Sequence, residues 1–277
     1  MWRKINKIIF WVLALAGLGP AAFGLSAEKN IPYRSLEKGE FSGLRWNTCD
    51  LYHSPKPRGI VFLVHGGSWT VGDKNLDFIP EIATRLTAEG FSVVSPNYRL
   101  SPFARHPAHI EDTVKALAFI WKRLDNPKLP LVLLGHSAGG HLVALLAADP
   151  FRLVEAGVDP KIISGVVTVS GVFEGESFPV DPSVALLGTN QERLWPMKMA
   201  QAAMPPHLLI AAGEDLPSLA PQAERYAEKI RLAGTRSTFL LAKKRNHATV
   251  FWNLRLPGDP VFETVLTFLN EAARISD

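Results

Sequence analysis

LVLLGHSAGG, residues 131–140, is the most informative stretch of this 277-residue chain. Four apolar residues of a β-type run lead into Gly135, Ser137 and Gly139 in the spacing G-x-S-x-G, and helical periodicity follows. Glycine is expected at both flanking positions because so tight a turn leaves no room for side chains. The pattern predicts a strand, a sharp turn that raises the Ser137 hydroxyl above the strand end, and a helix. A tight turn with a serine helix cap is the simpler alternative.

Short apolar runs alternate with helical segments on both sides of this stretch. Strands that are apolar on both faces are typical of a mostly parallel sheet covered on both sides. Such runs are Ile60–Val64, Phe91–Ser95, Gly165–Ser170, His207–Ala212 and Ser237–Leu241. Helical spacing occurs in Pro80–Glu89, Ile110–Leu124, Gly139–Ala148, Ala220–Ala233 and Val261–Arg274. The alternation predicts an α/β fold with a doubly wound sheet, to which residues 33–52 add one or two antiparallel edge strands.

Residues 173–206 interrupt this alternation. The segment holds apolar residues and several prolines, and it is too long for a plain helical crossover. We expect a small cap insertion over the functional site.

The N-terminal segment, residues 1–27, has the features of an export signal. A basic start with Arg3, Lys4 and Lys7 precedes an apolar stretch and small residues, with AFG (22–24) and LSA (25–27) as possible cleavage tripeptides. The apolar stretch is also about long enough for an uncleaved membrane anchor, and a buried helix is a third possibility. We expect an exported or membrane-anchored protein whose folded domain spans residues 28–277, with membrane contact through this segment alone.

Composition sets further limits on function. The chain is 47% hydrophobic and 20% charged, as expected for a globular protein, and its net charge is +4. Beyond the N-terminal segment the charges are mixed, so no nucleic-acid surface is predicted. Cys49 is the only cysteine, which excludes an intramolecular disulfide.

A second motif, HGGSW at residues 65–69, follows the apolar run Ile60–Val64. An acyl-transfer enzyme needs two backbone N–H groups directed at the oxyanion that develops during attack. Ala138, after the serine, would supply one, and Gly67 or Ser68 would supply the other. A flexible loop is the simpler interpretation of these glycines.

The base and the acid are predicted from chain order, because in this arrangement the serine is followed by an acid and then by a histidine. His207 opens a strand, so it is expected at the wrong end of the sheet, whereas His247 follows the last run. Asp215, which follows the run His207–Ala212, would orient the histidine, with Glu214 as the second choice. The other histidines are expected to have structural roles, and His65 is expected to hold its own loop by hydrogen bonds. No metal site and no cofactor are predicted.

Together these motifs resemble those of carboxylesterases and kynurenine formamidases of the α/β-hydrolase superfamily. The resemblance is strong over about residues 50–150, where DLY (50–52), GDK (72–74), NYRLSP (97–102) and the segment 106–112 also match. It implies catalytic Ser137, Asp215 and His247, and a Trp69 that lines the pocket or braces the turn. His136, which flanks the serine turn, is a further candidate for the substrate pocket. Ser68 replaces the glycine of hormone-sensitive-lipase relatives, and an exported chain differs from the often cytosolic formamidases.

The expected activity is hydrolysis of a carboxylic ester of a small molecule through an acyl-enzyme, without a cofactor. An arylformamidase or small amidase would use the same residues. A peptidase related to prolyl oligopeptidases would need a propeller for which this chain is too short. A non-catalytic binding module on the same fold is the remaining alternative. Acyl specificity and oligomeric state are not predicted.

Overall fold

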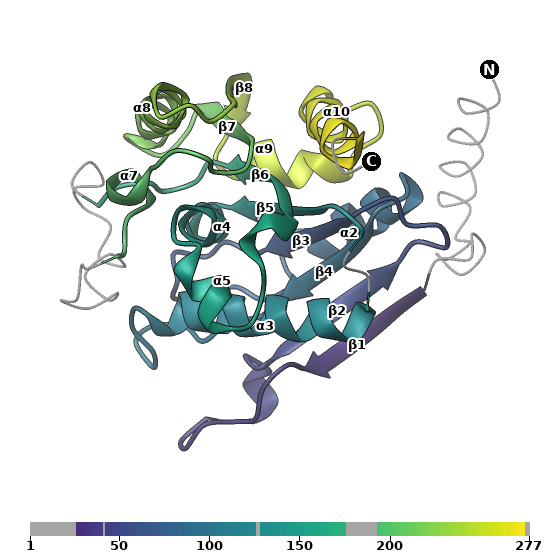
Figure 1. Ribbon diagram of the computed structural model, residues 1–277. Helices are drawn as coiled ribbons and strands as arrows, with labels where there is room; N and C mark the ends of the chain where they lie inside the picture. Colours follow the sequence, from purple (N-terminus) through teal and green to yellow (C-terminus); the bar gives the residue numbers. More distant parts are fainter. Residues whose placement is uncertain (1–25, 41, 126–127, 176–192, 275–277) are drawn as a thin grey trace.

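The computed structural model describes residues 26–40, 42–125, 128–175 and 193–274, which form a single twisted sheet with helices on both faces (Figure 1). Eight strands lie in the order β1-β2-β4-β3-β5-β6-β7-β8. They are β1 (Ser26–Pro32), β2 (Thr48–His53), β3 (Ile60–Val64), β4 (Ser92–Pro96), β5 (Leu131–His136), β6 (Ile163–Val169), β7 (His207–Glu214) and β8 (Ser237–Asn246). Strands β3 to β8 run parallel, and β2 and β1 extend one edge in antiparallel pairing.

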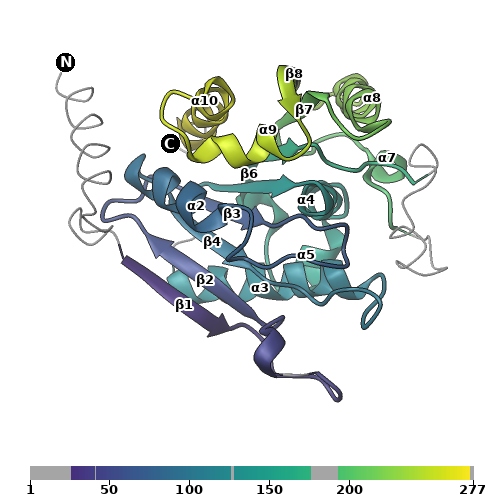
Figure 2. The ribbon, with the colours of Figure 1, turned by 180° about the vertical axis from the view of Figure 1, so that it is seen from behind.

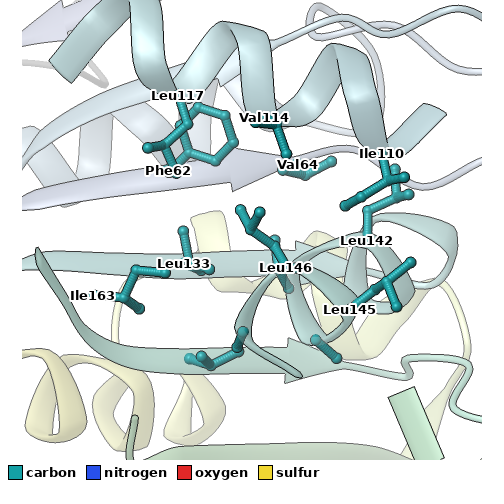
Figure 3. Packing of buried hydrophobic residues seen from close by; sticks show 14 of the residues in the cluster. Phe62, Val64, Ile110, Val114, Leu117, Leu133, Leu142, Leu145, Leu146 and Ile163 are labelled. Atoms are coloured by element: carbon teal, nitrogen blue, oxygen red, sulfur yellow. The ribbon is translucent and has the colours of Figure 1, made fainter. Parts of the chain in front are cut away.

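Two apolar layers cover the sheet. On one face, α3 (Ala108–Leu124), α4 (Ala138–Ala148) and α8 (Leu219–Leu232) pack on strand residues that include Phe62 and Leu133 (Figure 1). Figure 3 shows this packing between α3, α4 and the strands. The opposite face carries α2 (Ile79–Ala88), α9 (Thr249–Trp252) and α10 (Pro260–Arg274), which pack on alternate strand residues such as Val61 and Val132 (Figure 2). Burial of both strand faces is the reason for the continuous apolar runs.

Shorter helices connect these elements. They are α5 (Phe151–Glu155), α7 (Pro196–Met199) and the 3₁₀ turns η2 (Ser42–Leu44), η3 (Pro160–Ile162) and η4 (Asn253–Arg255). No helix in the part of the chain that the structure describes is both long and apolar enough to cross a membrane.

The predicted α/β fold is confirmed, and every predicted strand and helix is present within a few residues of its expected bounds. The edge is different in one respect. Of its two strands only β2 lies in residues 33–52, while β1 begins at Ser26, inside the segment assigned to the export signal. Residues 1–25 of that segment lie outside the described residues.

The cap insertion is described only in part, because residues 176–192 of the predicted range 173–206 lie outside the described residues. At its carboxyl end, Leu194 and Trp195 are buried in a cluster with Trp69 and Ala138. This end of the insertion therefore packs against both motifs, and its role as a cap stays a prediction.

Candidate active site

Ser137 lies on the sharp turn between β5 and α4. Its backbone has φ 52° and ψ −118°, a region that is unfavourable for a residue with a Cβ and that usually persists where the surrounding structure imposes it. A Cβ added to Gly139 would overlap the carbonyl oxygens of Val64 and His65, so the helix start can approach β3 only with glycine there. Ser137 occupies the cap position of α4, but its side chain makes no cap hydrogen bond. The serine-cap alternative does not describe this side chain.

His247 and Asp215 meet Ser137 from two other loops. His247 follows β8, and its Nε2 lies 3.0 Å from Ser137 Oγ, while its Nδ1 lies 2.7 Å from Asp215 Oδ1. A carboxylate only accepts hydrogen bonds, so Nδ1 carries the proton and Nε2 is left to accept from the serine hydroxyl. The order Ser–His–Asp in space is that of a nucleophile, a base and an orienting acid.

Asp215 is nearly buried, with a side chain 3% exposed. Burial raises its pKa, but hydrogen bonds from His247, Ser170 and the backbone of Ala212 outweigh this and hold the pKa below its ordinary value. The Ser170 hydroxyl donates to Oδ2 at 2.6 Å and the Ala212 N–H donates to the same oxygen at 3.0 Å. Glu214, the second choice, is exposed at the end of β7, and Asp215 is the carboxylate that contacts His247.

Ser170 is a site residue that sequence reasoning missed. It directly follows β6, at the carboxyl edge of the sheet where loops of parallel strands gather. Its position there is the one signal that could have identified it, because β6 and β7 are neighbours and β7 leads to Asp215.

The glycine turn after β3 lies against the serine turn. A Cβ built on Gly66 would lie 3.2 Å from Ser137 Cβ. Gly67 has φ 112°, and a Cβ there would overlap the carbonyl of Val71, so this position requires glycine. Among the hydrogen bonds of the described residues, the backbone N–H groups of Gly67, Ser68 and Ala138 have no acceptor. These groups are free to bind an oxyanion near Ser137, and their assignment as donors stays a prediction.

Trp69 and His136 are both buried, at 1% and 6% exposure. Trp69 Nε1 donates to His141 Nδ1 at 3.1 Å, and His141 Nε2 lies 2.8 Å from the carbonyl of Leu194. Burial lowers the pKa of His141 to about 3, so its ring is neutral and can accept from the indole. These contacts favour the bracing role for Trp69, while the pocket role of both residues stays a prediction.

The remaining histidines lie apart from this proton path. His65 Nδ1 lies 2.7 Å from the Gly66 carbonyl oxygen, and the His65 ring stacks on Tyr98. These contacts hold the loop that carries His65. His207 is at the amino end of β7, the opposite edge from His247, and its Nδ1 lies 2.7 Å from the Pro205 carbonyl. Within the described ranges, no group of three His, Cys, Asp or Glu side chains is placed to hold a metal ion.

Comparisons with known proteins show what the sequence of this chain is similar to. A family model described as BD-FAE matches residues 49–170. Esterase LipC of Mycobacterium tuberculosis is 28% identical over 212 residues, 67% of this chain and 51% of LipC, so the chain spans about half the length of that relative. A kynurenine formamidase of Danio rerio is 24% identical over 70% of this chain and 67% of its own.

Solved structures show the same fold. Esterase B of Lactobacillus rhamnosis superposes with a TM-score of 0.73 over 98% of this chain and 95% of its own, at 21% identity. At this identity the likeness establishes the α/β-hydrolase architecture of the chain, and the chemistry must be argued from the site itself.

Proposed function

We propose that this chain, which has the α/β-hydrolase fold and resembles esterases and kynurenine formamidases in sequence, hydrolyses carboxylic esters of small molecules through an acyl-enzyme on Ser137. The observation that carries the proposal is the continuous contact from Ser137 Oγ through the His247 ring to Asp215, at 3.0 and 2.7 Å. Both distances are within the range of hydrogen bonds that transfer or orient a proton.

The proposed reaction has two halves. Ser137 Oγ attacks the ester carbonyl carbon as its proton passes to His247 Nε2, and the carbonyl oxygen becomes an oxyanion bound by backbone N–H groups of Ala138 and of Gly67 or Ser68. The tetrahedral intermediate collapses, and His247 gives its proton to the departing alcohol. Water then attacks the acyl-enzyme by the same steps and releases the acid. Asp215, held ionised by its donors, stabilises the imidazolium that forms in each half.

An amidase activity is the second candidate, because relatives of this chain include kynurenine formamidases. Cleavage of a formamide would use the same three side chains and the same oxyanion donors. Comparing kcat/KM for N-formylkynurenine and for short p-nitrophenyl esters separates the two. A higher value for the formamide would replace the ester proposal.

Ser137→Ala provides the direct test. The variant should lose at least about 10⁴-fold in kcat on p-nitrophenyl butyrate, because the nucleophile is removed. Its thermal unfolding midpoint should remain close to that of the wild type, since only one partly accessible hydroxyl is lost. Labelling by a fluorophosphonate probe should disappear with the activity.

Ser35→Ala is the matched control, because Ser35 is exposed and lies in the loop after β1. It should keep both turnover and labelling. Undiminished hydrolysis by Ser137→Ala would overturn the proposed function, and failure of the wild type to label would favour the non-catalytic alternative.

A further inference from the structure

His136 precedes the nucleophile, yet its ring contacts the loop of the base. Its Nε2 lies 3.0 Å from the main-chain carbonyl oxygen of His247. A carbonyl oxygen accepts, so Nε2 must carry the proton of a neutral His136 ring. The same ring lies 4.9 Å from the His247 ring, centroid to centroid. One side chain on β5 is therefore bonded to the backbone that carries the base.

Two further contacts place the ring between loops. It stacks on Phe251 of α9 with 4.6 Å between centroids and 7° between planes. On the side of the glycine turn, a Cβ built on Gly66 would lie only 3.0 Å from His136 Nδ1. His136 thus fills the space between the turn that offers oxyanion donors and the loop that offers the base.

The ring is suited to this place because it stays uncharged. Burial, together with a smaller effect of the nearby His247, lowers the pKa of His136 to about 3. A positive charge here would oppose the imidazolium that His247 becomes during turnover. Among the described residues Nδ1 has no hydrogen-bond partner, which carries a cost that a purely apolar side chain would avoid. Packing alone therefore does not account for histidine at this position.

The other hydrogen bonds of this loop, among the described residues, do not hold the main chain of His247. Asp215 holds the imidazole at Nδ1, and the Asn246 side chain accepts from the N–H groups of Ala248 and Thr249 within the turn. These bonds shape the turn and orient the ring, whereas the bond from His136 ties the His247 main chain to the strand that carries Ser137.

We propose that His136 is a positioning residue that sets the distance between His247 Nε2 and Ser137 Oγ by donating a hydrogen bond to the His247 carbonyl. The inference rests on the proposed function, because it gives that function its geometry. A reacting pair displaced by about 1 Å can lose about 10²-fold in rate, so one such bond has a measurable effect.

Two variants separate the donor from the ring. His136→Gln keeps an N–H donor the same number of bonds from Cβ but loses the stacked ring. His136→Phe keeps the ring against Phe251 and loses the donor. We expect kcat to fall about tenfold or more in the Phe variant, to stay within about threefold of wild type in the Gln variant, and KM to change little in either.

Stability provides the second readout. The Phe variant should unfold at a temperature close to that of the wild type, because the lost hydrogen bond to the His247 carbonyl is offset by removal of a buried nitrogen without a partner. A decrease in kcat without a decrease in stability is not expected of a residue that only packs. Wild-type kcat in the Phe variant, or equal losses in both variants, would overturn the proposal.

NMR of the wild-type protein keeps the test independent of how the variants fold. The ¹⁵N shifts of His136 should report a neutral ring protonated at Nε2 throughout about pH 5 to 9. A ring that titrates in this range, or that is protonated at Nδ1, contradicts the inferred bond. A wild-type protein without esterase turnover would contradict the proposed function instead, and the tautomer would still decide for or against the bond.

Discussion

Asp215 receives donors at both of its carboxylate oxygens. Oδ1 accepts from His247 and from the Leu216 N–H, and Oδ2 accepts from Ser170 and the Ala212 N–H. A carboxylate satisfied in this way is fixed in orientation, and only one geometry of the imidazole fits it. Among the residues that the structure describes, Ser170 is the one outside the three predicted ones whose side chain donates a hydrogen bond to this acid.

Ser170→Ala should therefore weaken both activity and stability. Loss of one donor raises the pKa of Asp215 toward its usual value and loosens its orientation, and we expect kcat to fall about threefold to tenfold. The free energy of unfolding at neutral pH should fall by about 1–2 kcal/mol.

This loss in stability should depend on pH. The folded-state pKa of Asp215 is depressed, so its ionisation stabilises the fold above the unfolded value of about 4, and the contribution disappears as the pH falls through the folded value. Urea unfolding of wild type and variant should give the largest difference near neutral pH and a smaller one in acid below about pH 4. A difference that is constant with pH would contradict this assignment, and Ser35→Ala should show none.

Ser137 and His247 could be predicted individually because G-x-S-x-G and chain order constrain them. The choice of Asp215 over Glu214 was less constrained, since either carboxylate follows the strand, and burial decides between them in the structure. The roles of Ser170 and His136 depend on which loops become neighbours after folding. No local sequence pattern shows which loops become neighbours.

Among the elements, β3 and α4 come into close main-chain contact beside the candidate site. The start of α4 crosses the end of β3 at Gly139, and Gly140 lies against Gly171 after β6. This close contact places the serine turn beside the glycine turn.

Gly139→Ala tests the contact. The added methyl group would overlap main-chain atoms of Val64 and His65, which cannot move without displacing β3. We expect a loss of about 3 kcal/mol or more in the free energy of unfolding, and a loss of turnover in any folded fraction.

Gly43→Ala is the matched control, because a Cβ there has open space and φ is not positive. It should change the free energy of unfolding by less than about 1 kcal/mol. A Gly139→Ala variant as stable as this control would show that β3 and α4 do not need the contact.

The central elements were predictable because their strands are apolar on both faces. A short, continuously apolar run such as Ile60–Val64 is typical of a strand that is covered on both sides. Strand β1 was not. Its sequence, SAEKNIP, has no apolar alternation and adjoins the apolar N-terminal segment. It forms by pairing with β2, and Asp50 on β2 accepts from the Asn30 N–H and from Lys29.

Across the whole molecule, a buried ion pair joins the sheet edge to the loop that begins with the glycine turn. Lys74 and Asp50 are both 0% exposed, with Nζ 3.2 Å from Oδ1, and Lys74 also donates to Asn30 Oδ1 at 2.8 Å. The backbone N–H of Lys74 donates to Asn97 Oδ1 after β4. The loop that begins with the glycine turn is thereby held by β1, β2 and β4.

Lys74→Met should lower the free energy of unfolding by about 3 kcal/mol, because the charge of Asp50 stays buried without this partner. We expect a loss at the low end of the range for a broken buried ion pair, because Lys29 still contacts Asp50. The double variant Lys74→Met/Asp50→Leu should recover much of that stability, since no unpaired charge remains buried. Chemical denaturation of the two variants gives the comparison. A double variant less stable than Lys74→Met would contradict a desolvation penalty as the cause.

The general placement of the site was also predictable at this scale, because loops after parallel strands meet at their carboxyl edge. The shape of the substrate pocket was not. It depends on how side chains of separate loops pack together, which periodicity does not encode.

The early start of β1 has a consequence for maturation. Ser26 pairs with His53 and Ala27 with Tyr52, so the bond after Ala27 lies within a hydrogen-bonded strand. A processing peptidase needs accessible, unpaired chain. If residues 1–27 are an export signal that is cleaved after Ala27, the cut must precede folding of the sheet edge, whereas a cut after Gly24 would leave the whole strand to the mature protein.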